Sequence, residues 1–153
     1  NHALVGNSGA NMIYESAGMH ASLLGFSLES VVIDNDIIGA TQRTIKGIEV
    51  SEERLSFETI KDVCLNGPGH YLGSGQTLQL MQTEYLYPAV GDRRSPNEWN
   101  EQGATDVTER ATRKVKEILG SHFPSHVPEA IDDEIRRRFP VKLKRQGMRP
   151  PET

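Results

Sequence analysis

Only one segment of this chain of 153 residues has the pattern of a β-strand. It is Met12-Ile13-Tyr14, which follows a short helical segment broken at Gly6 and Gly9. One strand cannot make a sheet, because both of its edges expose unpaired backbone N–H and C=O groups. The chain is therefore either an α-helical domain with one extended segment or the C-terminal piece of a larger protein, and we favour the second.

A long predicted helix follows the strand. Ser27 can accept a hydrogen bond from a free first-turn amide, and Gly47 ends the helix after Lys46. Its apolar residues form a surface broad enough to be buried on more than one side: Leu28, Val31, Val32, Ile37, Ile38 and Ile45. Strand, glycine-containing loop and helix make one βα unit. The predicted fold class is α/β: the C-terminal fragment of a TIM (β/α)8 barrel, followed by a mostly helical extension.

The remaining sequence predicts the helices of that extension. They run from Ser51 to Asn66, from Thr77 to Leu86, from a cap at Thr105 and from Pro128, with a short turn at Pro96 around Trp99. We expect residues 1–48 to be the last βα unit and residues 49–140 to be the helical extension packed on the barrel. Residues 141–153 are expected to be a basic, flexible tail.

Charge divides the chain into two parts. Up to Ile135, acidic residues outnumber basic ones two to one, whereas residues 136–149 carry basic charges alone. Nucleic-acid binding needs a basic surface that neutralises phosphates, so we expect no nucleic-acid partner for the acidic body. The basic tail can contact an acidic partner or RNA, but a solvated chain terminus is the simpler interpretation.

Several other classes of protein are excluded or disfavoured. No run of about 18 apolar residues predicts a membrane span, and no secretory signal pattern is visible. Cys64 is the single cysteine, which excludes an internal disulfide and multi-cysteine metal sites; it is expected to be a small buried residue. His122 and His126 are separated by Pro124, which spoils a helical pair of metal ligands. We expect a cytoplasmic protein with no metal site.

The glycine-rich stretch of residues 67–75 is not a nucleotide loop, because a helix precedes it and the glycine spacing differs from the dinucleotide fingerprint. ATP, NAD and S-adenosylmethionine are therefore not expected to bind.

Glu15 is a candidate site residue for a different reason. Strand alternation places it on one face with Asn11 and Ile13, directed into the barrel, and barrel enzymes have their sites at the carboxyl ends of the strands.

Several blocks of sequence occur in a defined order and spacing: residues 27–36 (SLESVVIDND), 46–50 (KGIEV), 67–73 (GPGHYLG), 76–78 (QTL) and 87–94 (YPAVGDRR), followed by Trp99 and residues 103–104. Over about residues 1–135 these blocks resemble the C-terminal third of the trimethylamine methyltransferase family. The resemblance implies a TIM barrel that moves a methyl group from a tertiary or quaternary amine to the cobalt of a corrinoid protein. The family includes pyrrolysine-containing trimethylamine enzymes and pyrrolysine-free relatives that act on glycine betaine and similar amines.

The implied partners are therefore a corrinoid protein and a methylated amine, with the corrinoid (cobalamin) carried by the partner and no cofactor bound by this chain alone. A homo-oligomer is compatible with the sequence, and the isolated chain is expected to be inactive. Positioning supplies much of the rate in such a displacement, and a permanent cation calls for aromatic faces and carboxylates. Glu15 and His20 are the candidate catalytic residues, and the same two residues with His70 and Tyr71 are the candidate substrate-binding residues.

Each candidate also has a structural interpretation. Glu15 can pair with a basic residue of the barrel, His20 can cap the next segment, and His70 or Tyr71 can anchor a loop. A second functional class stays open as well: a helical binding or interaction module with no chemistry of its own.

Overall fold

The computed structural model of the chain describes residues 1–124 and 126–144. Its elements are α1 (His2–Asn7), β1 (Met19–His20), β2 (Gly25–Phe26), α2 (Leu28–Lys46), α3 (Glu52–Leu55), α4 (Phe57–Leu65), α5 (Gly75–Thr83), α6 (Pro96–Glu101), α7 (Val107–Ser121) and α8 (Glu129–Arg138). The two strands form a short antiparallel hairpin in which Met19 pairs with Phe26 and His20 pairs with Gly25.

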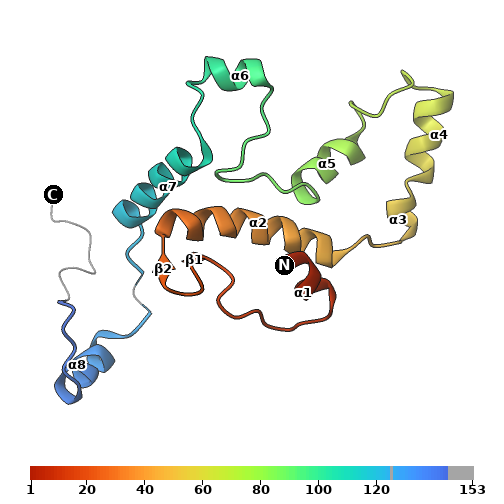
Figure 1. Cartoon of the computed structure of the whole chain (residues 1–153). Helices are drawn as coiled ribbons and strands as arrows, with labels where there is room; N and C mark the ends of the chain where they lie inside the picture. Colours follow the sequence, from red (N-terminus) through yellow and green to blue (C-terminus); the bar gives the residue numbers. More distant parts are fainter. Residues whose placement is uncertain (125, 145–153) are drawn as a thin grey trace.

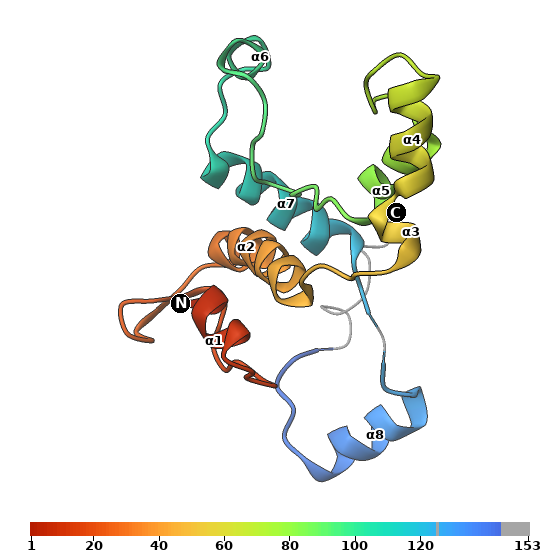
Figure 2. The same cartoon turned by 90° about the vertical axis from the view of Figure 1, so that its right-hand side faces the viewer.

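Helix α2 is the centre of the structure. The Ser27 side chain accepts a hydrogen bond from the Ser30 backbone N–H, and Gly47 ends the helix with φ at 70°. Helix α7 packs along one side of α2, and α1 packs along the other (Figure 2). The predicted long helix and its cap are confirmed, and α1 and α7 both pack against this helix.

The buried core is small for a chain of this size. In residues 1–124 and 126–144, the buried apolar side chains are Val63, Val90, Ala111 and Val115. The accessible surface is 12532 Å², whereas a compact monomer of this mass exposes about 7,700 Å². Helix α6, the α3–α4 pair and α8 project away from the α1–α2–α7 trio (Figure 1), so most of their apolar side chains stay exposed.

The strand expected near Asn11–Glu15 is wrong. Residues 11–17 are turns and irregular backbone, and the hairpin strands come later, at Met19–His20 and Gly25–Phe26. A strand is held by hydrogen bonds to a neighbouring strand, and no part of the described chain pairs with residues 11–15. The hairpin turns through Ala21, Ser22 and Leu23, which all have positive φ angles.

The other predicted helices are present with shifted boundaries. The single helix expected from Ser51 is two helices, because Ser56 adopts a left-handed conformation (φ 57°) and its hydroxyl donates to the Arg54 carbonyl at 3.1 Å. Asp106, not Thr105, caps α7, through a reciprocal capping box with Glu109.

Helix α5 ends at Thr83, before the expected end at Leu86, and Pro128 is the N-cap of α8. The expected tail of residues 141–153 lies outside the described residues from position 145 onward.

Candidate functional site

A cleft of about 380 Å³ lies between α1, the segment that leads into β1, and α2. Its lining includes two carboxylates, an aromatic ring and an imidazole, contributed by Glu15, Asp34, Tyr14 and His2. Carboxylates attract a cation by charge, and an aromatic face attracts it through the ring quadrupole. The cleft therefore has the chemistry to bind a small organic cation.

The segment that carries Glu15 is held from both sides of the cleft. The His2 Nε2–H of α1 donates to the Ser16 carbonyl at 2.8 Å, and the Gly18 N–H donates to Asp34 Oδ2 of α2 at 2.8 Å. Gly18 has φ at 76°, and a Cβ atom there would lie 2.4 Å from Val31 Cγ2, so any other residue would be strained at this position. These contacts fix the path of residues 15–18.

Glu15 is the one predicted site residue that lines this cleft. It is exposed at the cleft and has φ at 52°, in the left-handed region that non-glycine residues seldom adopt. Among the described residues, no side chain or backbone group makes a hydrogen bond or ion pair with its carboxylate. The carboxylate is therefore available to a ligand.

His20 lies on β1 outside the lining of the cleft. Its Nε2 is hydrogen-bonded to Ser30 Oγ at 2.6 Å, in the first turn of α2. This contact ties the hairpin to the helix, so the structure gives His20 an anchoring contact near the start of α2.

His70 and Tyr71 lie in the exposed loop between α4 and α5. Figures 1 and 2 both place that loop far from α1 and the β1–β2 hairpin, so the described chain does not bring these residues to Glu15. The Tyr71 hydroxyl lies 3.8 Å from Cys64 Sγ, and this hydrogen bond raises the pKa of the tyrosine. Cys64 is exposed, so the expectation of a buried cysteine is wrong.

Of the four titratable or aromatic side chains named above in the cleft lining, sequence reasoning missed three: His2, Tyr14 and Asp34. One of them did carry a signal. Asp34 follows Val31 by three residues and precedes Ile38 by four, so it is an acidic residue on an apolar helical face. Such a position indicates a specific partner, which here is the Gly18 N–H.

A second polar cluster fixes the chain between α5 and α7 against α2. The Asp36 carboxylate accepts three consecutive backbone N–H groups, from Ala89 at 3.0 Å, Val90 at 2.7 Å and Gly91 at 3.0 Å. Burial acts to raise the pKa of Asp36, but the hydrogen bonds from Val90, Ala89 and Gly91 outweigh it and hold the pKa below its ordinary value.

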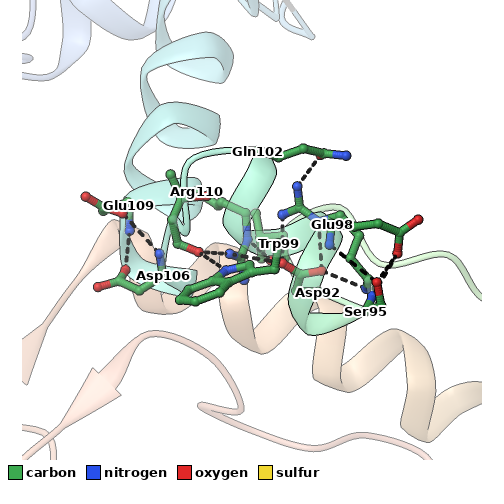
Figure 3. Close-up of polar contacts among 11 residues, drawn as sticks. Asp92, Ser95, Glu98, Trp99, Gln102, Asp106, Glu109 and Arg110 are labelled. Atoms are coloured by element: carbon green, nitrogen blue, oxygen red, sulfur yellow. Dashed lines mark hydrogen bonds and ion pairs between the residues drawn. The ribbon is translucent and has the colours of Figure 1, made fainter.

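Figure 3 shows how this cluster continues into α6 and α7. Arg110 Nε donates to the Val90 carbonyl at 2.7 Å, and Trp99 Nε1 donates to the Thr105 carbonyl at 2.9 Å. The Arg94 guanidinium donates to both carboxylate oxygens of Asp92, at 2.9 and 2.7 Å, and lowers its pKa strongly. All of these polar groups satisfy one another, which indicates a structural role for the cluster.

A metal site and a membrane-spanning helix are both absent from residues 1–124 and 126–144. No group of three or more His, Cys, Asp and Glu side chains there is arranged to hold a metal ion. No helix in that part of the chain has the length and apolar character needed to cross a membrane.

Comparison with known proteins relates the chain to amine methyltransferases. The family model described as trimethylamine methyltransferase (MTTB) matches residues 2–148. The chain is 40% identical over 115 residues to a trimethylamine methyltransferase of Methanosarcina thermophila. The aligned segment covers 75% of this chain and 23% of that protein. It is 38% identical over 139 residues to one from Methanosarcina mazei, covering 86% of this chain and 27% of that protein.

It is also 26% identical over 141 residues to a glycine betaine methyltransferase of Desulfitobacterium hafniense, covering 92% of this chain and 28% of that protein. The chain thus spans about a quarter of the length of these relatives. Because the family model matches almost every residue, the chain belongs to the trimethylamine methyltransferase family.

Proposed function

We propose that this chain is the C-terminal part of a methyltransferase that moves a methyl group from an amine of the trimethylamine or glycine betaine type to the cobalt(I) of a corrinoid protein. The family match over residues 2–148 carries the proposal. The names of its relatives, trimethylamine and glycine betaine methyltransferases, support the two donor classes.

The two donors share one chemical requirement. Glycine betaine, and trimethylamine in its protonated form, each present a methyl group on a cationic nitrogen. When that methyl group is displaced, the nitrogen keeps the bonding electron pair and leaves as a neutral amine. The acceptor corrinoid supplies the cobalt(I) nucleophile, and the protein's task is to hold donor and acceptor in line.

In this proposal Glu15 binds the cationic nitrogen of the donor through its unpaired carboxylate, and Tyr14 offers an aromatic face in the same cleft. His20, His70 and Tyr71 stay predicted site residues. They lie outside the cleft lining, so a role for them requires further parts of the protein that bring them near the donor.

We also propose that residues 1–48 close a TIM barrel and that the following helices pack on it. The exposed apolar side chains support a segment that packs on further protein, because exposed patches of this extent mark contact surfaces. We place the enzyme in the cytoplasm, where a lone thiol such as Cys64 stays reduced.

The test is methyl transfer by the full-length protein. Glycine betaine and trimethylamine are supplied in turn as donors with a reduced corrinoid protein, and formation of methylcobalamin is followed by absorbance. Transfer from either donor, absent when the protein is omitted, supports the proposal. No transfer from either donor would overturn it and favour a helical interaction module.

A further inference from the structure

The backbone on both sides of Glu15 is held by side chains from two different helices. His2 of α1 donates to the carbonyl of Ser16, and Asp34 of α2 accepts from the N–H of Gly18, both at 2.8 Å. Both side chains also line the cleft that Glu15 lines. Neither of them makes a hydrogen bond or ion pair with the Glu15 side chain itself.

We propose that His2 and Asp34 are positioning residues that hold Glu15 for a methylated ammonium ion in this cleft; the proposal rests on the function proposed above. Glu15 has a left-handed backbone, a conformation that persists when the surrounding structure fixes it. The constraint comes from the two hydrogen bonds just described. His2 holds Ser16, the residue after Glu15, and Asp34 holds Gly18, three residues after Glu15.

A purely architectural role explains these two contacts less well. Helices α1 and α2 already touch directly, because the Gly6 backbone lies so close to Ile45 that a Cβ atom on Gly6 would be 2.2 Å from Ile45 Cδ1. The helix pair therefore does not need His2 and Asp34 to stay together. What these side chains hold is the path of residues 15–18 between the helices.

The two carboxylates of the cleft have separate tasks. Asp34 Oδ2 is engaged by the Gly18 N–H, whereas no described group makes a hydrogen bond or ion pair with the Glu15 carboxylate. Asp34 thus acts as a hydrogen-bond acceptor for the backbone, and Glu15 carries the charge for the ligand. This division predicts that Asp34 can lose its charge but not its acceptor oxygen.

The test measures binding of tetramethylammonium chloride to the full-length protein by calorimetry. Asp34→Ala and His2→Ala remove the hydrogen bonds and should weaken binding by about tenfold or more. Asp34→Asn keeps an acceptor oxygen and His2→Gln keeps an N–H donor, so both should bind within about threefold of the wild type. Asn35→Ala, an exposed neighbour on α2, is the matched control and should be unchanged.

A double-mutant cycle with Glu15→Gln separates positioning from direct contact. If Asp34 acts through Glu15, then Asp34→Ala should cause little further loss in the Glu15→Gln background. His2→Ala gives the same test from α1 if Asp34→Ala does not fold. Equal losses in Asp34→Asn and Asp34→Ala, additive losses in the cycle, or no binding by the wild type would each overturn the inference.

Methyl transfer is measured separately, so the two proposals fail in different ways. Binding that follows this pattern without methyl transfer upholds the positioning role and rejects the enzymatic function. Methyl transfer with alanine variants that bind like Asn35→Ala rejects the positioning role and keeps the function.

Discussion

Arg43 and Glu84 join the last turn of α2 to the end of α5. The Arg43 guanidinium donates to the Glu84 carboxylate at 2.8 Å and to the Glu84 backbone carbonyl at 2.9 Å. Arg54 of α3 donates to the other carboxylate oxygen at 2.7 Å, and Lys46 lies 3.9 Å away. With 15% of its side chain exposed, Glu84 connects α2, α3 and α5 through polar contacts.

Glu84→Gln should lower the melting temperature of the full-length protein at neutral pH. The hydrogen bond from Arg54 lowers the pKa of Glu84 below its ordinary value of 4.5; burial opposes this shift, and the charges of Arg54, Lys46 and Arg43 add to it. A carboxyl group with a lower pKa in the folded state stabilises the fold above its unfolded pKa. That contribution is lost as the pH falls through the folded pKa.

The difference in melting temperature between wild type and Glu84→Gln should therefore shrink as the pH drops below 4.5. Thermal unfolding at several pH values measures it. Glu58→Gln is the control, because the Glu58 side chain is 82% exposed beside Lys61 and should contribute little at any pH. A difference that stays constant with pH would contradict the assignment.

Asp36→Ala should destabilise the protein by on the order of 1–2 kcal/mol, because three backbone N–H groups lose their acceptor and water replaces it only in part. The loss is moderate since Ala89 and Gly91 are exposed and can be hydrated. Urea unfolding of the full-length protein measures it, with Asn35→Ala on the same helix as the reference. A stability equal to that reference would show that the loop is held by other contacts.

Local signals explain which parts of the fold could be predicted from sequence. The ends of α2 follow from Ser27 and Gly47, which act on neighbouring backbone groups, and α7 follows from its apolar spacing. The hairpin could not be predicted in the same way. Its turn places Ala21, Ser22 and Leu23 at positive φ, where glycine or asparagine is the usual signal.

The cleft could be predicted only in part, because most of its contacts join residues that are distant in the sequence. Glu15 was found because it follows an apolar run, although that run is not a strand. His2 and Asp34 join it through contacts across 14 and 16 residues of chain, and such contacts leave no periodic pattern in the sequence. His70 and Tyr71 were grouped with Glu15 by family resemblance, and the described chain keeps them apart.

Gly18→Ala should weaken both folding and tetramethylammonium binding. A Cβ atom at this position meets Val31 Cγ2 at 2.4 Å and Phe26 Cε2 at 2.9 Å, and the positive φ adds about 1–2 kcal/mol of backbone strain. Gly73→Ala is the control, because no heavy atom lies within 4 Å of a Cβ atom there. Melting temperature and calorimetric affinity are compared for both variants; equal behaviour of the two would contradict the close packing at Gly18.

Under the proposed function, Glu15→Gln and His20→Ala should each lower methyl transfer from a quaternary amine by the full-length protein. Glu15→Gln removes the negative charge from a carboxylate that has no partner in the described chain, and misplacing a reacting group by about 1 Å can cost about 10²-fold in rate. His20→Ala removes the contact with Ser30 Oγ, so its effect reaches the cleft through the hairpin that carries Met19. The measurement is methylcobalamin formation with glycine betaine and trimethylamine, alongside the melting temperature of each variant. Wild-type rates in both variants, with unchanged melting temperatures, would reject the site assignment and leave the family membership intact.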